Sequence, residues 1–268
     1  MKIRIKFTKQ GPVRFIGHLD VMRYFQKVMR RADVNIRYSE GFSPHQIMSF
    51  ASPLSVGLTS NGEYMDIEVH STRDSKTMVE EINAVSCEGI QVASYRLLDD
   101  SAKNAMSQVA AADYTMWFKE GYVPEDERGF YERFLVFCER ESIEITRQTK
   151  KGEKIVDLKP YLYEIRVEER TADGGCDGAA QTAGRSDAAA ETQETEEAAG
   201  SLQVFMKLSA GSAANVKPEQ LMGAFYASEG LEYPVFAFQV QREEVYAEEG
   251  TEKNHSFKSL NDYGTEIL

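Results

Sequence analysis

The first 32 residues, MKIRIKFTKQGPVRFIGHLDVMRYFQKVMRRA (residues 1–32), contain a strand pattern followed by a helix pattern. Between Met1 and Thr8, apolar residues alternate with charged ones, which predicts a half-buried strand. Residues 18–32 instead place apolar side chains three or four positions apart, which predicts an amphipathic helix. The apolar stripe of this helix consists of Val21, Met22, Phe25, Val28, Met29 and Ala32.

The residues that follow repeat these two patterns. We expect strands at residues 47–50, 63–69 and 90–98, with a helix at 74–87 between the last two. The Ser-, Gly- and Pro-rich residues 38–53 read as a loop around the first of these strands. The resulting order, β-α-β-β-α-β, is typical of a ferredoxin-like unit, which we place at residues 1–98.

A second, similar run follows a connector at residues 99–111, and we place it at residues 112–246. Its expected elements are strands at 114–119, 143–149, 161–168, 202–208 and 235–246, helices at 126–139 and 218–228, and a tight turn at 150–154. The sequence therefore predicts an α+β protein with two ferredoxin-like units and antiparallel sheets.

Two segments have compositions that do not favour folding. Fourteen of the thirty residues 171–200 are Ala or Gly, and none is aromatic or a large aliphatic. Such a stretch buries too little apolar surface to fold, so we expect a disordered insertion that loops out between two paired strands. Residues 247–268 are acidic and are expected to form a flexible tail.

The charge of the 268-residue chain is −12 in total but is unevenly distributed. Residues 1–50 carry ten Lys or Arg against three Asp or Glu, which gives +7. Residues 171–200 carry seven acids against one Arg, and residues 243–268 carry seven acids against two Lys. The total argues against general nucleic-acid binding, yet the N-terminal part can present a basic face.

The sequence favours a cytoplasmic protein without a metal or cofactor. No apolar run approaches the ~20 residues that cross a bilayer, and the N-terminus lacks the apolar core of a signal peptide. The three cysteines, Cys87, Cys138 and Cys176, are far apart and odd in number, so a disulfide framework is not expected. No CxxC spacing is present to hold an iron–sulfur cluster or a Cys-rich zinc site.

The most distinctive sequence motifs lie within residues 14–68. They include Gly17-His18-Leu19-Asp20, the pair Arg30-Arg31, YSEGFSPH at 38–45 and PLSVGLTSNGEYMDIE at 53–68. With these motifs the chain resembles the bacterial radical SAM-associated protein family, most strongly over residues 1–70, and IVDLKP at 155–160 supports the resemblance. That family has no assigned function. The resemblance implies a radical SAM protein as partner and identifies no reaction.

Basic and aromatic residues near the first helix suggest contacts to RNA. Arg23, Lys27, Arg30 and Arg31 fall on the polar side of the helix, which reads either as a solvated face or as a phosphate-binding face. Arg14, Arg37, Tyr38 and Phe42 lie nearby, and aromatic rings can stack on unpaired bases. A second cluster on a predicted hairpin either extends this RNA track across both units or solubilises the turn; its members are Arg147, Lys150, Lys151 and Lys154.

Two histidines are candidates for acid–base chemistry. His18 is expected at a helix start, where the dipole favours a neutral ring that can act as a base or a ligand, but it can equally brace the loop. Asp20 in the same turn suits a capping role better than catalysis. His45 could complete an acid–base pair with His18. No metal site is predicted, because the four histidines show neither HxH nor HxxxH spacing.

Three functions remain open at this point. The first is an accessory protein that binds RNA or a ribosome-related substrate and presents it to a radical SAM enzyme. The second is an RNA-processing or RNA-modifying enzyme with His18 as general base and Arg23 or Lys27 supporting the phosphate. The third is a protein–protein scaffold that pairs through strand edges. The P-loop, GxGxxG, HExxH and GxSxG motifs are all absent, which favours the first.

Overall fold

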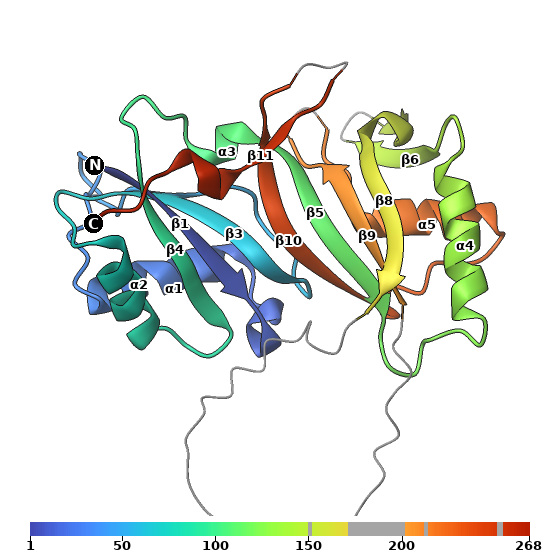
Figure 1. Cartoon of the computed structure of the whole chain (residues 1–268), viewed down its shortest axis with the longest axis horizontal. Coiled ribbons are helices and arrows are strands. Elements are labelled where there is room, and N and C mark those ends of the chain that lie inside the picture. The colour runs from blue at the N-terminus through green and yellow to red at the C-terminus, as the bar shows by residue number, and fades with distance from the viewer. Residues whose placement is uncertain (150–151, 171–201, 212–213, 251–253) are drawn as a thin grey trace, which may run out of the picture.

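One large, mostly antiparallel sheet organises the protein in a computed structural model that describes residues 1–149, 152–170, 202–211, 214–250 and 254–268 (Figure 1). The helices are α1 (His18–Arg31), α2 (Ser75–Ala84), α3 (Ala105–Gln108), α4 (Glu127–Cys138) and α5 (Pro218–Ser228). The strands are β1 (Lys2–Lys9), β2 (Met48–Phe50), β3 (Thr59–Glu68), β4 (Ile90–Leu98), β5 (Val109–Phe118), β6 (Glu144–Thr149), β7 (Gly152–Asp157), β8 (Leu162–Glu169), β9 (Leu202–Ser209), β10 (Phe238–Glu248) and β11 (Phe257–Ser259). The predicted α+β class is confirmed.

The first half of the chain contributes one end of the sheet. Its elements follow one another as β1-α1-β2-β3-α2-β4. In space the strands lie in the order β4-β1-β3, with β2 paired to β3 as well, and all of these pairs are antiparallel. The alternation at the N-terminus places Ile3, Ile5 and Phe7 in the core, as the sequence predicts.

The second half repeats this strand order. Its main elements follow one another as β5-α4-β8-β9-α5-β10, and the strands lie in the order β10-β5-β9-β8, all antiparallel. The hairpin β6–β7 is inserted between α4 and β8 and forms a separate two-stranded sheet. The two halves join where β3 runs parallel to β10, at Gln241 opposite Thr59 and Arg242 opposite Ser60.

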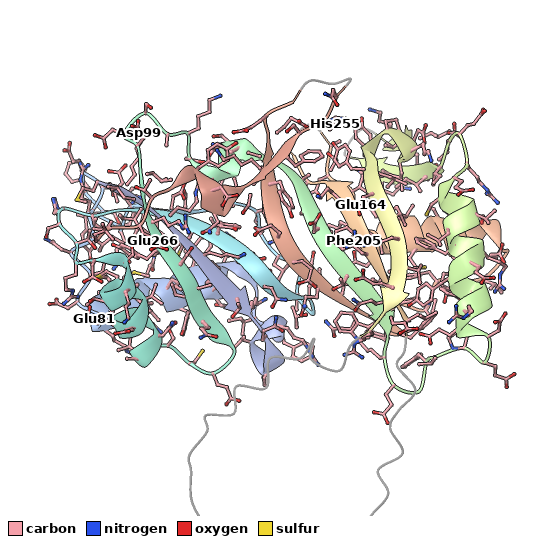
Figure 2. The ribbon with its side chains drawn as sticks, in the orientation of Figure 1. Glu81, Asp99, Glu164, Phe205, His255 and Glu266 are labelled. Atoms are coloured by element: carbon pink, nitrogen blue, oxygen red, sulfur yellow. The ribbon has the colours of Figure 1, made fainter. Side chains whose placement is uncertain are left out.

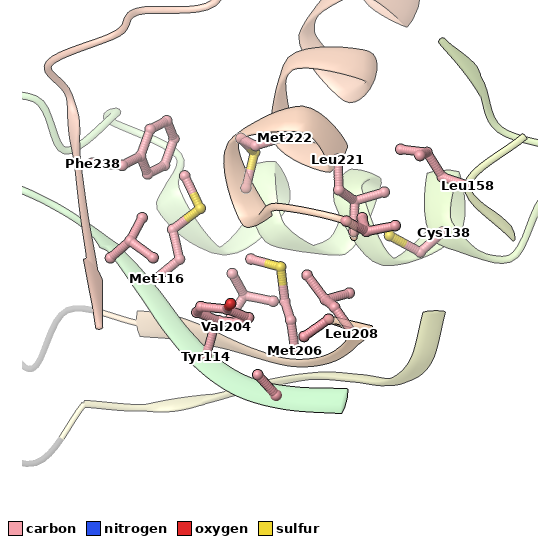
Figure 3. Close-up of a cluster of buried hydrophobic side chains, with 14 of the residues drawn as sticks. Tyr114, Met116, Cys138, Leu158, Val204, Met206, Leu208, Leu221, Met222 and Phe238 are labelled. Carbon is pink, nitrogen blue, oxygen red and sulfur yellow. The ribbon is translucent and has the colours of Figure 1, made fainter. Parts of the chain in front are cut away.

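Each half has its own hydrophobic core. In the first half, α1 and α2 pack on the sheet around the fully buried Phe25, and Figure 1 shows α1 passing behind the strands. In the second half, α4 and α5 pack around Phe134 and Phe225. Figure 3 shows this second core, where Met206 of β9 and Leu221 of α5 lie among the labelled side chains. The short helix α3 lies on the opposite face of the sheet, where the N–H of Ala105 donates to Asp66 and the Gln108 side chain accepts from Arg4.

Several sequence predictions need correction. Residues 152–154, expected to lie in a tight turn at 150–154, belong to β7, which begins at Gly152. The C-terminal residues do not form a free tail in the part that the structure describes: β11 pairs with β10, the carbonyl of Leu260 accepts from Arg4, and the N–H of Ile267 donates to Ser75. The connector at 99–111 contains α3 and the start of β5. The insertion predicted at residues 171–200 lies outside the described residues.

None of the described helices is long and apolar enough to cross a membrane. The division into two ferredoxin-like units stays a prediction. The matching strand orders of the two halves are compatible with it.

Candidate nucleic-acid interface

The outer face of α1 presents four cations. The helix begins after Gly17 and buries Val21, Phe25, Val28 and Met29 against the sheet. Residues at i, i+4, i+7 and i+8 share one side of a helix, so the opposite side carries the exposed side chains of Arg23, Lys27, Arg30 and Arg31. These four residues are called the α1 basic face below.

The charges of this face are only partly neutralised. Arg23 forms an exposed ion pair with Asp20 at 3.2 Å, one turn earlier. Arg30 donates through Nε to the carbonyl of Gln26 at 3.1 Å, which is not a charge partner. Within the described part of the chain, Lys27, Arg30 and Arg31 have no carboxylate within ion-pair distance. Three positive charges are thus available to an anion.

Tyr38 lies beside this face. The Gln46 amide donates to the carbonyl of Gln26 at 3.2 Å and to the hydroxyl of Tyr38 at 3.4 Å, which ties the loop to the helix turn that also holds Arg30. The Tyr38 side chain is 47% exposed. The hydroxyl of Tyr38 and the guanidinium of Arg30 are therefore both linked to the carbonyl of Gln26, Tyr38 through Gln46.

Phe42 lies at the tip of the same loop, which we call the 38–45 loop. Its side chain is fully exposed, and the preceding Gly41 has a φ of +109°, a conformation that side chains rarely adopt. A fully exposed phenylalanine on a glycine-dependent turn packs against none of the described residues. It is available for stacking on a ligand.

Arg14 and Arg37, the other two predicted phosphate contacts, are engaged within the protein. The Arg14 guanidinium lies over the ring of Phe15, with 4.8 Å to the ring centroid. Arg37 pairs with Glu68 at 2.7 Å. Arg37 thus differs from Lys27 and Arg31, because its charge already has a partner.

The second predicted basic cluster is on the other half of the molecule. Arg147 lies on β6 and donates to the carbonyl of Asn215 and to the Gln220 side chain, each at 2.8 Å. Lys154 lies on β7 and its side chain is exposed. Lys150 and Lys151 lie outside the described residues. Figure 1 shows α1 and the β6–β7 hairpin at opposite ends of the sheet.

His18 is the first residue of α1 and is half-buried. Its ring meets the edge of Phe50, with 5.2 Å between centroids, and it lines a cavity of about 20 Å³ with Lys9, Ser52 and Glu63. This space holds at most one water molecule. Its ring nitrogens have no hydrogen-bond partner among the described residues.

His45 lies elsewhere. Its Nδ1 is 2.8 Å from the Ser39 hydroxyl, and it lines a different cavity of about 400 Å³ with Lys2 and Asp66. The two cavities share no lining residue, so the structure does not bring His18 and His45 together as an acid–base pair. Within the described ranges, no three His, Cys, Asp or Glu side chains gather at a metal-binding distance.

A buried polar cluster at the junction of the two halves is absent from the sequence predictions. Arg242 of β10 is bidentate to Glu63 of β3, at 2.7 and 2.5 Å, and also donates to the carbonyl of Ser52. Lys9 is buried beside them and donates to the carbonyls of Arg14 and Ile16. Burial lowers the pKa of the Lys9 ammonium, an effect that nearby Glu63 opposes.

The face of the sheet opposite to α1, α2, α4 and α5 also carries cations, but these are paired. Arg166 bonds to Glu164 and Glu168 and stacks over Phe205, and Figure 2 shows Glu164 and Phe205 on neighbouring strands. Lys207 lies 3.6 Å from Asp113, and Lys6 lies 2.8 Å from Glu244. The α1 basic face is therefore better suited to polyanions than this face of the sheet.

Comparison with known proteins adds a family. A family model described as an uncharacterized protein conserved in bacteria (DUF2344) matches residues 2–218. The matched range includes the α1 basic face, the 38–45 loop and the β6–β7 hairpin. A search of curated proteins finds no match. The match covers most of the chain and carries no statement of activity.

Proposed function

The chain belongs to the DUF2344 family of uncharacterized bacterial proteins, and we propose that it is an accessory protein that binds RNA through the α1 basic face. The observation that carries the proposal is the set of unpaired cations Lys27, Arg30 and Arg31 on one exposed helix face. Unpaired cations in a row can contact successive phosphates without first breaking an internal ion pair.

The aromatic side chains of the 38–45 loop support RNA rather than a simple anion. Tyr38 is linked through Gln46 to the Gln26 carbonyl, which also accepts from Arg30, and Phe42 is fully exposed a few residues further on. Single-stranded RNA offers both phosphates and unpaired bases, and bases stack on such rings. A face with cations alone would bind many anions equally well.

The proposal includes a radical SAM protein as partner and a ribosome-related substrate as one source of the RNA. The motifs of residues 17–68 support the partner through the family resemblance. The proposal also treats each half as a ferredoxin-like unit, supported by the matching strand orders β4-β1-β3-β2 and β10-β5-β9-β8. A cytoplasmic location agrees with the free thiols of Cys87 and Cys138.

The test is the salt dependence of RNA binding by a charge-reversed protein. The full chain and a Lys27→Glu/Arg30→Glu variant are titrated with a short mixed-sequence single-stranded RNA at several salt concentrations. Binding by the variant should weaken at least about tenfold at low salt, and the slope of log Kobs against log salt should become shallower by about 1.4, which corresponds to two lost contacts to single-stranded RNA.

A matched variant controls for the change in net charge. Arg128→Glu/Arg140→Glu alters the total charge equally, and both residues are exposed at or near α4 in the other half. RNA binding by this control should stay within about twofold of that of the unmodified protein. Equal weakening by both variants, or no salt-dependent binding by the unmodified chain, would rule out an RNA contact at the α1 basic face.

A further inference from the structure

A groove of about 930 Å³ runs between β6 and α5, with the end of α4 as its floor. It lies in the second half of the molecule and shares no residue with the α1 basic face. The β6 side is formed by every residue from Ser142 to Gln148. The α5 side is formed by residues 219, 220, 223, 224, 227 and 228, and the floor by Phe137 and Arg140.

The β6 side of the groove is an open strand edge. Successive side chains of a strand point to opposite faces, so a groove along one face would meet alternate residues only. Here seven consecutive residues line the groove, which therefore runs along the backbone edge. Among the described strands, β6 pairs with β7 alone, so its second edge has no strand beside it.

The pairing register shows which backbone groups face the groove. The N–H of Leu158 donates to the carbonyl of Ile143 at 2.8 Å, which makes these two residues a hydrogen-bonded pair. In an antiparallel ladder such pairs alternate with non-bonded pairs, and Glu144 lies opposite Asp157 in the next pair. Glu144, Thr146 and Gln148 therefore direct their N–H and C=O groups away from β7, towards the groove.

The α5 wall leaves room for a peptide. It presents Gly223, Ala224 and Ala227, whose small side chains keep the helix surface set back from β6. A Cβ atom built on Gly223 would meet only the Tyr233 ring, at 4.0 Å, so the space beside it is open. The width of the groove is thus a consequence of these small residues.

Two buried polar atoms at this groove lack partners within the described part of the chain. They are Nε of Arg147 and Oε2 of Glu219, a donor and an acceptor. Buried polar groups are normally hydrogen-bonded, because an unsatisfied group costs about 1–3 kcal/mol. A peptide backbone offers both kinds of partner, whereas a purely apolar ligand offers neither.

The charge of the lining favours an acidic occupant. Three cations line the groove, namely Arg140, Arg147 and Lys217, and none has a carboxylate partner among the described residues. Two acids also line it, Glu144 and Glu219. Glu144 is exposed, because it lies on the face of the strand opposite to Ile143 and Ile145, which pack towards the core. Arg147 shares that inner face by the same alternation.

We propose that this groove binds an extended acidic segment of a partner protein, which adds as a strand to the open edge of β6. The seven residues 142–148 span about 23 Å when extended, so the site accommodates about six or seven residues of the segment. The backbone of the segment pairs with Glu144, Thr146 and Gln148. Its alternate side chains pack against the small residues of α5, and its acidic side chains lie near Arg140 and Lys217. This proposal does not depend on RNA binding.

The test uses a capped peptide of alternating valine and glutamate, about seven residues long, titrated into the isotope-labelled full chain. We expect NMR shifts at the amides of Glu144, Thr146 and Gln148. Gly223→Leu fills the groove and Thr146→Pro removes an outward N–H without affecting the ladder to β7, so each should weaken binding at least about tenfold. Val136→Leu on the exposed side of α4 should leave binding unchanged.

Changes to the peptide keep the test independent of protein folding. A peptide methylated on the backbone nitrogens that pair with β6, and one with lysine in place of glutamate, should both bind at least about fivefold more weakly. Absence of shifts at millimolar peptide, or unchanged binding by Gly223→Leu, overturns the proposal. A dimer of the chain that is abolished by Thr146→Pro would overturn it in favour of self-pairing.

Discussion

The two halves of the molecule share a strand order and differ in the connection from the first helix to the second strand. In the first half, residues 32–47 lead from α1 to β2 and include the 38–45 loop. In the second half, the β6–β7 hairpin stands at the equivalent place, between α4 and β8. The candidate RNA surface and the candidate peptide groove are thus both built on this connection.

The outer faces of the two helices differ as well. The exposed side of α1 carries four cations beside Asp20. The exposed residues of α4 alternate in sign, with Arg128, Glu132 and Arg133 among them, and Arg133 contacts both Asp126 and Glu229. Core packing fixes only the inner face of a helix, so the outer faces of equivalent helices can acquire different partners.

The junction of the halves offers the largest expected effect. Arg242→Met leaves the Glu63 carboxylate buried without its bidentate partner, and both side chains are less than 10% exposed. Removal of one member of such a pair costs about 3–5 kcal/mol, so the free energy of unfolding should fall by this amount in urea titrations. The transition should stay single if the continuous sheet makes the halves one cooperative unit.

The double variant Glu63→Leu/Arg242→Met serves as its control. It removes both charges, so it should be more stable than Arg242→Met alone. A loss below about 1 kcal/mol in the single variant would show that water reaches Glu63. Two separate transitions in the unmodified chain would instead show that the halves unfold independently.

The sequence predicts most elements because their periodicities are local. The strand at Ile90–Leu98 and the helix at Pro218–Ser228 agree with the structure at both ends. The strand β7 is not predicted because Ile155 and Val156 are its only apolar residues, and its pairing with β6 depends on a turn rather than on burial. The order of the C-terminal segment is not predicted either, because Leu260 and Thr265 are held by Arg4 and Leu97, which are far away in sequence.

The site residues likewise fall into those that the local sequence predicts and those that it does not. Helical spacing predicts the exposure of the α1 basic face. It could also have predicted the Asp20–Arg23 ion pair, which is a local i,i+3 contact. The pair of Glu63 and Arg242 is 179 residues apart in sequence, and no local rule connects them. The separation of His18 from His45 likewise depends on where β2 lies, which sequence spacing does not determine.

The base of the β6–β7 hairpin offers a smaller effect, which depends on pH. Asp157 accepts from the N–H groups of Ile143 and Lys159, at 2.8 and 3.0 Å, and these bonds lower the pKa of its carboxyl group. Because the folded pKa is the lower one, the stabilisation is present above the ordinary carboxyl pKa and is lost as the pH falls through the folded value. Asp157→Asn should therefore cost about 1 kcal/mol at pH 7.

The measurement is urea unfolding of both proteins at neutral and acidic pH. The difference between them should shrink below about pH 4, as the carboxyl group of the unmodified protein becomes protonated. A difference that stays constant across this range would show that Asp157 acts through its shape and not through its charge. No equivalent effect is expected from the 38–45 loop, which no carboxylate anchors in this way.

The smallest expected effect on stability is also the sharpest test of the difference between α1 and α4. Asp20→Asn removes the exposed partner of Arg23, which should cost only about 0.5 kcal/mol. The same change frees a fourth cation on the α1 basic face, so RNA affinity at low salt should rise a few-fold. Glu132→Gln, at the exposed side of α4, alters the net charge equally and should leave RNA affinity unchanged. If both variants raise the affinity equally, total charge governs binding; if neither does, RNA does not contact α1.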